Sequence, residues 1–417
     1  MSHHLPEGWQ WVRLGDICEI NPSRDRLNRS SGSLTSYLPM AAISEDASGI
    51  NYVETRPYSE LANGYTFFRS GDILFAKITP CMENGKVAIA DELIDGIGFG
   101  STEFHVLRPG EMVDTYLVFS LVADTHFRQL ATRYFTGSAG QQRVSEEFLI
   151  SYLFPLPPLD EQRRIAAVLR DADTSIARVE DSIAAAQAVK RGVMRRLFTY
   201  GLGDESTPTK HTEVGETPKH WLIEPLEKHT ASSMFGPRFP ANAYNDQGNV
   251  ATLRTTDLDD EGNIHYETMP LAELDLKAFE SHLLQPGDMT ITRSGTIGIA
   301  SVFQDYRIPV LPGAFLIRFR LQASVTSDYL RQYFNSDIGR NRVLSIAAGG
   351  VQKNLQGSAM LRLHVPVPPI GEQREIAAIL QTHDDAIRAL QAERERLRAV
   401  KRGLMQGLLS GEIRTSP

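Results

Sequence analysis

Three short motifs contain residue types that could bind a nucleotide or a cofactor. The run Gly96-Ile97-Gly98-Phe99-Gly100 is rich in glycine, but it lacks the spacing of a dinucleotide-binding loop and leads towards a strand-like run. Gly85-Lys86 has neither a following Ser or Thr nor a glycine five residues earlier, so it does not match a phosphate-binding P-loop. Asn21-Pro22-Ser23 shares only two residues with the Asn-Pro-Pro-aromatic motif of adenine methyltransferases, and we interpret it as a turn. None of these motifs supports a cofactor site.

Histidine and cysteine, which are frequent metal ligands and catalytic groups, show no suitable pattern. The 11 histidines lack metal-ligand spacing. The two cysteines, Cys18 and Cys81, cannot form a Cys-rich zinc site or a disulfide framework, and they fit a reducing cytoplasm. No Ser/His/Asp or Cys/His set stands out, although a triad assembled in space would leave no such pattern. We therefore predict that the chain is not an enzyme and that it binds no metal or cofactor itself.

Composition and charge limit the possible partners. The chain has 417 residues, 41% of them hydrophobic and 23% charged, as expected for a globular protein with two or three domains. The formal net charge is −8, with −7 on residues 1–155 and −4 on residues 201–365. A polyanion would therefore have to contact local basic clusters on an acidic surface. Because neither an apolar span nor a signal-peptide pattern occurs, we expect a cytoplasmic protein that does not contact a membrane.

The strongest pattern in the chain is an internal repeat. Residues 157–169 (PPLDEQRRIAAVL) recur as residues 368–380 (PPIGEQREIAAIL), at an offset of 211. The match continues without a gap to Met194 and Met405. A gapless match of this length indicates a duplicated half-protein, because solenoid repeats have much shorter periods.

Weaker matches connect the segments that precede these repeats. Residues 71–77 (GDILFAK) resemble residues 287–293 (GDMTITR) at an offset of 216, whereas Gly85 and Gly298 match at an offset of 213. The first copy therefore has three extra residues in the loop 78–84. Each half of the chain combines a variable globular segment with a constant segment.

Both constant segments are predicted to be long helices. Their apolar or small residues are spaced alternately four and three apart, as in a coiled coil, so we favour pairing of the two helices over packing of each on its own globular segment. Asp160 is the predicted N-cap of the first helix, and Gly201 and Gly411 are the predicted C-terminal stops. The first stripe consists of Ile165, Leu169, Ala172, Ile176, Val179, Ile183 and Ala186, and the second includes Ile376, Leu380, His383, Ile387, Leu390 and Leu397.

Two glycines, Gly192 and Gly403, lie at matching positions inside the predicted helices. A glycine within a helix costs about 1 kcal/mol relative to alanine. We therefore infer close approach of another helix or contact with a partner, although simple inheritance from the duplication would also explain the match.

The variable segments have a mixed composition of short strands and helices. β-rich runs at 72–78, 86–90 and 104–107 are separated by turn residues, and 116–130 and 327–334 have helical patterns. We predict an α+β protein with a pseudo-twofold internal repeat. Two globular domains, residues 1–155 and 202–366, are separated by two long antiparallel helices, within residues 156–201 and 367–413, that form a coiled coil.

The duplicated PPxxEQRxIAAxL segments, each behind a variable segment with a Gly-Asp strand, resemble the specificity subunit of type I restriction-modification systems. The resemblance covers the whole chain. It implies that each globular domain is a target-recognition domain for one half of a bipartite double-stranded DNA site. It also implies that the helices bind two methyltransferase subunits, which hold S-adenosylmethionine, and that restriction subunits join through the assembled complex. Residues 71–78 and 102–108 are similar to one version of the recognition domain, and residues 287–294 and 312–315 resemble another.

Basic and amide side chains in turns between strands are the candidate DNA contacts. Arginine and lysine suit guanine or phosphate, whereas glutamine and asparagine suit adenine. Each of them could equally be a solvated loop residue. The candidates are Lys77, Asn84, Lys86, Gln141, Gln142 and Arg143 in the first domain, and Arg293, Ser294, Thr296, Gln352, Lys353 and Asn354 in the second.

Two other hypotheses compete with a DNA-specificity subunit. One is a coiled-coil scaffold that binds proteins without DNA specificity, and the other is a self-contained DNA-modifying enzyme. The unlike sequences of the two domains favour an asymmetric bipartite target, because unlike surfaces recognise unlike half-sites.

Overall fold

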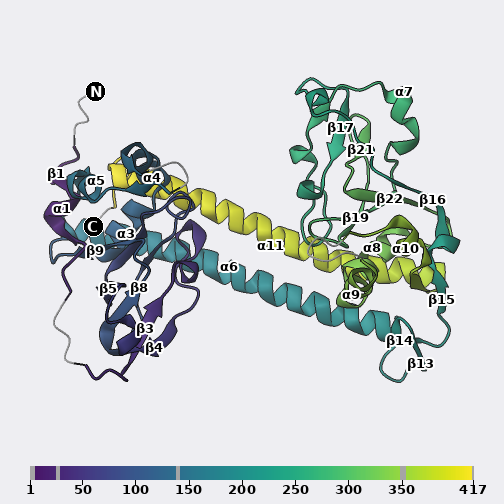
Figure 1. Cartoon of the computed structure of the whole chain (residues 1–417), viewed down its shortest axis with the longest axis horizontal. Coiled ribbons are helices and arrows are strands. Elements are labelled where there is room, and N and C mark those ends of the chain that lie inside the picture. Colours follow the sequence, from purple (N-terminus) through teal and green to yellow (C-terminus); the bar gives the residue numbers. More distant parts are fainter. Residues whose placement is uncertain (1–4, 25–28, 138–140, 348–353, 416–417) are drawn as a thin grey trace. The chain divides into compact units, whose positions relative to one another are not determined.

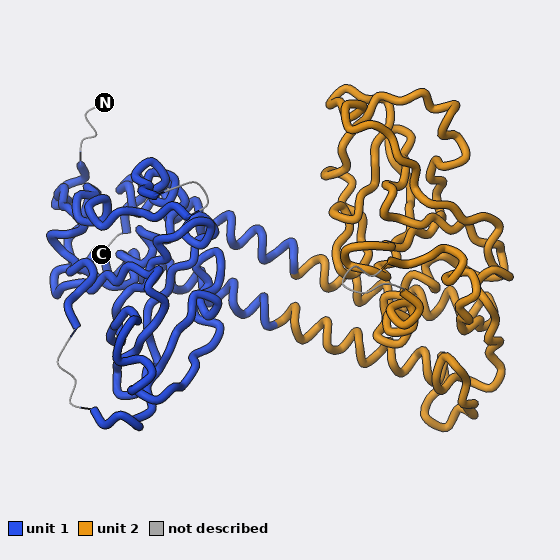
Figure 2. The backbone as a smooth tube through the Cα atoms, in the orientation of Figure 1, with its two compact units in different colours: residues 1–181, 391–417 blue, residues 182–390 orange. Residues whose placement is uncertain are grey.

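The computed structural model describes residues 5–24, 29–137, 141–347 and 354–415. The chain forms two compact units, residues 1–181 with 391–417 (unit 1) and residues 182–390 (unit 2). Each long helix belongs partly to one unit and partly to the other, as the colour change along both helices shows (Figure 2). The boundaries of the four segments expected from the sequence therefore stay a prediction.

Unit 1 contains a four-stranded antiparallel sheet of order β2-β9-β6-β7 and a second sheet of order β4-β3-β8-β5 (Figure 1). β3 and β8 are its one parallel pair among the described strands. The elements up to the first long helix are β1 (Gln10–Arg13), α1 (Leu14–Ile17), β2 (Cys18–Ile20), β3 (Leu34–Leu38), β4 (Glu54–Pro57), α2 (Tyr58–Leu61), β5 (Thr66–Arg69), β6 (Ile73–Ala76), β7 (Val87–Ile89), β8 (Ile97–Gly100), β9 (Phe104–Pro109), α3 (Thr115–Ala123), α4 (Thr125–Ala131), β10 (Phe135–Thr136), β11 (Arg143–Val144), α5 (Glu146–Ser151), β12 (Leu153–Leu156) and α6 (Leu159–Tyr200).

Unit 2 repeats the main sheet in the order β16-β22-β19-β20, so β6 corresponds to β19 and β9 to β22. Its second sheet has the order β18-β17-β21. The remaining elements are β13 (Thr209–Thr212), β14 (Gly215–Pro218), β15 (Leu222–Pro225), β16 (Thr230–Phe235), β17 (Val250–Leu253), β18 (Leu271–Ala272), α7 (Leu276–Phe279), β19 (Met289–Thr292), β20 (Ala300–Val302), β21 (Val310–Pro312), β22 (Leu316–Leu321), α8 (Ser327–Asn335), α9 (Asp337–Ile346), α10 (Gly357–Arg362), β23 (His364–Val367) and α11 (Ile370–Ser410). The predicted α+β class and the internal repeat are confirmed.

The repeated Gly-Asp pair closes the turn before each central strand. Asp72 accepts two hydrogen bonds from Arg108, at 2.8 and 2.7 Å, and one from a backbone amide in the turn. Asp288 does the same with Arg320, at 2.9 and 2.8 Å. Paired, fork-shaped bonds of this kind are among the stronger hydrogen bonds in proteins. The motif therefore has a structural role, since it ties the start of β6 to β9 and the start of β19 to β22.

The glutamine of each repeated helix motif connects the helix to its unit. Gln162 is 1% exposed and hydrogen-bonds to the carbonyls of Met112 and Pro157 and to the amide of Asp114. Gln373 is fully buried and satisfies three backbone groups in the corresponding way. Because buried backbone groups are costly to leave unpaired, this glutamine fixes the direction in which each helix leaves its unit.

The two long helices pair in antiparallel orientation inside each unit. In unit 1, Glu180 of α6 lies 2.8 Å from Arg398 of α11, and Asp173 pairs with Lys401. In unit 2, Lys190 of α6 lies 2.6 Å from Asp384 of α11. The predicted coiled coil is confirmed, and none of the stripe residues on α6 is exposed. The competing packing also occurs, because the helix ends enter the globular core of each unit.

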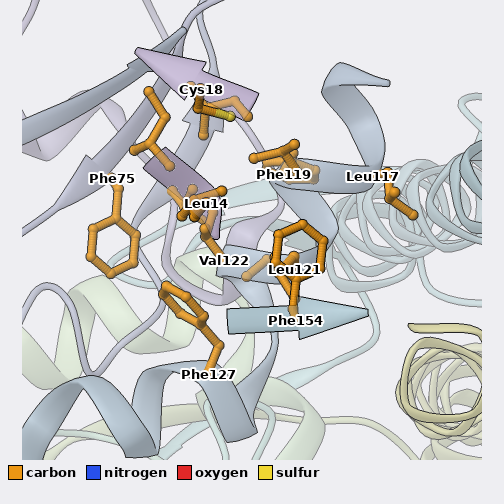
Figure 3. Close-up of a cluster of buried hydrophobic side chains, with 14 of the residues drawn as sticks. Leu14, Cys18, Phe75, Leu117, Phe119, Leu121, Val122, Phe127 and Phe154 are labelled. Carbon is orange, nitrogen blue, oxygen red and sulfur yellow. The ribbon is translucent and has the colours of Figure 1, made fainter. Parts of the chain in front are cut away.

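The core of unit 1 forms between its main sheet and the helices that cover it. Leu14, Phe75, Phe119 and Phe127 are each less than 7% exposed and belong to one cluster (Figure 3). The rings of Phe75 and Phe127 meet edge to face at 5.9 Å. A corresponding cluster in unit 2 packs β19 and β22 against α8. These cores hold the central strands from which the candidate site residues follow.

Several local predictions were revised by the structure. The predicted helix 116–130 is broken into α3 and α4 at Asp124, whose carboxylate caps α4. Asp160 lies inside the first turn of α6 instead of capping it. A Cβ added to Gly192 or Gly403 would meet nothing within 4 Å, so neither glycine marks a close approach inside the described chain.

Gly201 and Gly411 end the helices as predicted, with positive φ angles of 65° and 80°. No helix in the described part of the chain is long and apolar enough to cross a membrane.

Candidate nucleic-acid interface

A cationic residue directly follows strand β6 in unit 1 and strand β19 in unit 2, and its backbone makes the same hydrogen bonds in both units. In unit 1 it is Lys77, whose amide donates to the Glu103 carbonyl at 2.9 Å and whose carbonyl accepts from the Val144 amide at 2.9 Å. Strand β6 thus ends between the segment before β9 and the segment before α5. Val144 follows the predicted pair Gln142 and Arg143, so the structure brings these candidates beside Lys77.

The same two backbone bonds recur in unit 2. The Arg293 amide donates to the Phe315 carbonyl at 2.9 Å, and the Arg293 carbonyl accepts from the Leu355 amide at 2.9 Å. Leu355 directly follows the predicted contact Asn354. The candidates that lie close together in unit 1 therefore have counterparts that lie close together in unit 2. Independent solvated loops would not be expected to repeat the same backbone bonds.

We call Lys77, Gln141, Gln142 and Arg143 the unit 1 cluster, and Arg293 with Asn354 the unit 2 cluster. The arginine of the unit 1 cluster is neutralised by a carboxylate. Arg143 Nε and Nη2 donate to Glu103 at 2.8 and 2.7 Å, and Nη1 donates to the Gln141 carbonyl at 3.2 Å. The hydrogen bonds from Arg143 lower the pKa of Glu103, so the pair stays ionised at neutral pH. The Gln142 carbonyl accepts from the Thr79 amide at 3.0 Å. These contacts order the segment beside Lys77.

Lys77 is the half-buried cation at the centre of this cluster. Its ammonium makes no hydrogen bond or ion pair with the described residues, and its charge contributes to the lowered pKa of Glu103. His105 lies nearby, 5% exposed, with Nε2 2.9 Å from the Val144 carbonyl. Burial lowers the pKa of His105, so at neutral pH the ring adds no charge to the site.

The far end of the β6–β7 connection carries the other two unit 1 candidates. The ammonium of Lys86 donates to the backbone carbonyls of Met40 and Ile43, at 3.3 and 2.8 Å. Asn84 is exposed, and its Nδ2 donates to Glu45 at 3.0 Å. Lys86 thus holds a neighbouring turn in place. The connection spans 77–86, three residues longer than 293–299 in unit 2, as the repeat alignment predicted.

The arginine of the unit 2 cluster has different surroundings. The guanidinium carbon of Arg293 lies 4.2 Å from the ring centroid of Phe235, and Nε donates to Asn354 Oδ1 at 3.1 Å. Ser294 is half-buried and Thr296 is exposed in the following turn. The other two candidates, Gln352 and Lys353, lie outside the described residues. The role of all twelve candidates as DNA contacts stays a prediction.

Sequence reasoning missed the aromatic residues beside Arg293. Phe235 is 41% exposed and Phe315 is 57% exposed, although large aromatic side chains are usually more deeply buried. Exposed aromatics next to cations are common on surfaces that contact nucleic-acid bases. Phe315 lies in a segment that resembles a known recognition-domain version, but its exposure depends on how β22 and its neighbours pack.

The described residues contain no candidate metal centre and no activated thiol at Cys18. No group of three or more His, Cys, Asp or Glu residues with metal-binding geometry occurs in the described ranges. Cys18 is buried, and burial raises the pKa of its thiol to about 12, which makes it a poor nucleophile. The side chains at the two clusters can form hydrogen bonds, bind anions and stack on bases.

Comparisons with known proteins identify a matching family model, similar sequences and a similar fold. A family model described as the type I restriction modification DNA specificity domain matches residues 6–186 and 233–399. The chain is 26% identical over 419 residues to the putative type I restriction enzyme MjaX specificity subunit of Methanocaldococcus jannaschii, which covers 98% of this chain and 95% of that protein.

A second relative matches more closely but over a shorter region. The EcoEI specificity subunit of Escherichia coli is 40% identical over 163 residues, which are 39% of this chain and 27% of the relative. A chain from a solved structure of type I R-M complex assembly and conformational transition matches with a TM-score of 0.59 and 22% identity, covering 99% of this chain and 100% of that chain. At this identity the structural match shows the fold alone.

Proposed function

The chain belongs to the type I restriction-modification DNA specificity family, and we propose on this basis that it selects the DNA target of a cytoplasmic type I complex without catalysing any reaction itself. The observation that carries the proposal is the pair of equivalent clusters around Lys77 and Arg293. Each cluster presents a cation directly after a rigid central strand, and the backbone bonds that hold the cation are the same in both units. A DNA half-site for each unit is the simplest use of two such surfaces.

The two clusters differ in chemistry, which supports an asymmetric target. The unit 1 cluster combines the ammonium of Lys77, which has no partner among the described residues, with the ion pair of Arg143 and Glu103. The unit 2 cluster combines Arg293 with Phe235 and lacks a carboxylate hydrogen-bonded to the guanidinium among the described residues. Bases are distinguished by donor and acceptor patterns, so unlike side chains select unlike bases.

Two matching patches on the helices support the docking of two methyltransferase subunits. Val189 on α6 is 56% exposed and Val400 on α11 is 51% exposed, at the repeat offset of 211. Gly192 and Gly403 lie one helical turn further on, exposed and with open space around them. An exposed valine beside a glycine lets a partner helix approach closely, and two equal patches fit two copies of the same partner. S-adenosylmethionine would then be held by those subunits, and restriction subunits would join through the assembled complex.

The experiment that tests the proposal is methylome sequencing of cells that express the chain with its cognate methyltransferase. We expect adenine methylation at one asymmetric bipartite motif. Exchanging residues 1–155 for another recognition domain should change one half of the motif and leave the other half intact. A swap that altered both halves would contradict independent half-site recognition, and the absence of any motif would contradict the proposed function.

A control separates this function from the enzyme hypothesis. The purified chain, incubated with labelled S-adenosylmethionine and DNA, should incorporate no methyl groups, whereas addition of the methyltransferase subunit should restore incorporation. Incorporation by the chain alone would show that it is an enzyme. The scaffold hypothesis would gain support if the assembled complex bound all DNA sequences with equal affinity.

A further inference from the structure

The guanidinium of Arg293 makes two contacts with the described residues, and these contacts involve only part of the group. Its central carbon lies over the ring of Phe235, 4.2 Å from the ring centroid, and Nε donates to Asn354 Oδ1 at 3.1 Å. Nη1 and Nη2 make no hydrogen bond or ion pair with any residue in the described ranges. Among the described residues, the two terminal amino groups of Arg293 therefore form a fork of donors without an acceptor.

This fork matches one base among the four. In the major groove, guanine presents O6 and N7 as two adjacent acceptors, whereas adenine presents an acceptor beside a donating amino group. An arginine with both terminal amino groups free forms two parallel hydrogen bonds to guanine. A bidentate contact of this kind typically discriminates about 5-fold to 150-fold against the wrong base.

The surroundings of Arg293 reduce the cost of forming such a contact. A long side chain loses rotamer freedom when it binds, and this loss weakens binding unless the side chain is ordered beforehand. Stacking on Phe235 and the bond to Asn354 supply this order before DNA arrives. The Arg293 amide also donates to the Phe315 carbonyl, which fixes the backbone from which the side chain extends.

The unit 1 cluster does not offer an equivalent fork. Each of the three guanidinium nitrogens of Arg143 already donates a hydrogen bond, to Glu103 or to the Gln141 carbonyl, and the Glu103 carboxylate neutralises the charge. Lys77 has the position equivalent to Arg293, but an ammonium is a point donor without planar fork geometry. Arg143 is thus a positioning residue for the segment beside Lys77.

From this geometry we propose that Arg293 recognises a guanine in the half-site bound by unit 2, and that this bidentate recognition belongs to unit 2 alone. The inference rests on the proposed function. It assigns a specificity-determining role to one side chain, and it assigns a positioning role to the superficially similar Arg143.

The test compares the methylomes of the wild type and Arg293→Lys, each expressed with the cognate methyltransferase. Lysine keeps the charge but loses the fork. We expect the unit 2 half-site to contain a G·C pair whose preference is relaxed in the variant at that position only. The matched control is Arg307→Lys, which changes another arginine of unit 2 that stacks on an aromatic ring, Tyr306. It should leave the motif unchanged.

Competition binding by the assembled complex gives the magnitude. Duplexes that carry each base pair at every position of the half-site should show a preference for guanine of about 5-fold to 150-fold in the wild type. In Arg293→Lys this preference should fall below about threefold, while the other half-site keeps its preferences and serves as an internal control for folding. Arg143→Lys should relax no single position.

Three results would overturn the inference without touching the proposed function. An unchanged motif in Arg293→Lys would show that Arg293 does not recognise a base. Equal weakening on all duplexes would identify a phosphate contact instead. Relaxation of one base in Arg143→Lys would show that unit 1 uses its own arginine. A wild-type complex with no motif at all would instead refute the proposed function.

Discussion

The buried carboxylate of Asp384 provides the sharpest test of how the helices are held in unit 2. Asp384 is 3% exposed and accepts from Lys190 at 2.6 Å, from Arg331 at 3.0 Å and from Gln332 at 2.6 Å. Burial by itself would raise the pKa of Asp384, but the adjacent cations lower it below its usual value. Asp384→Asn keeps the shape of the side chain and removes its charge.

The expected cost follows from the geometry. At an effective dielectric constant of about 20, two unit charges 2.6 Å apart attract by about 6 kcal/mol. Part of this attraction offsets the cost of burying the ions, and removal of one partner from a buried pair typically costs about 3–5 kcal/mol. Lys190 keeps Glu261 and Arg331 keeps Gln381 in the variant, so we expect a value near the lower end of that range.

The repeat supplies a matched control in unit 1. Asp173 is equivalent to Asp384 and pairs with Lys401, but its side chain is 29% exposed against 2% for Asp384. Solvent screens such a pair, so Asp173→Asn should cost about 1 kcal/mol. The same substitution is made at the same repeat position, so the comparison tests the combined effect of deeper burial and of the second cation, Arg331, that only Asp384 contacts.

Urea unfolding of the full chain measures both variants. Fluorescence of Trp221, which is fully buried, reports unit 2 in a background with Trp9→Phe and Trp11→Phe, and fluorescence of Trp9 and Trp11 reports unit 1 in a background with Trp221→Phe. Adding Arg331→Met to Asp384→Asn should recover part of the lost free energy of unfolding, because among the described residues Arg331 then keeps only the neutral partner Gln381. Equal costs for Asp384→Asn and Asp173→Asn, or a neutral Asp384→Asn, would refute the reasoning.

Acid sensitivity checks the same carboxylate independently. A lowered pKa in the folded state means that the stabilisation is fully present above the unfolded pKa of about 3.9 and is lost as the pH falls towards the folded value. The wild type should therefore lose stability in that window more steeply than Asp384→Asn. Parallel pH profiles would contradict the assigned direction of the shift.

Three further predictions concern other parts of the chain. Gln373→Ala removes the side-chain partner of one buried and two partly buried backbone groups and should lower the free energy of unfolding of unit 2 by about 2 kcal/mol in urea titrations, whereas a neutral result would contradict its anchoring role. Burial lowers the pKa of His105, so stability should decline as the pH falls below about 6.5, and His105→Asn should flatten this decline in thermal unfolding scans. Val189→Glu and Val400→Glu should each remove one methyltransferase copy from the complex in native mass spectrometry, and loss of both copies from one substitution would argue against equivalent patches.

Patterns that depend on neighbours along the chain are predictable from the amino-acid sequence by itself. The repeat implied two equivalent halves, and the main sheets of the two units indeed share strand order and register. The stripe on α6 and the stops at Gly201 and Gly411 followed from helical periodicity and from the freedom of glycine to adopt positive φ. Such features are local or periodic, so residue type and spacing are enough to predict them.

The availability of each candidate side chain depended on residues far away in the chain. Arg143 and Arg293 are both candidates because of their residue type. In the fold, however, Arg143 forms an ion pair with Glu103, whereas Arg293 lies against the ring of Phe235. Lys86 likewise finds its acceptors more than 40 residues away, at Met40 and Ile43. A hydrogen-bonding group is free or occupied according to which partners the fold brings within about 3 Å, and that distance is set by the packing of strands and helices remote in sequence.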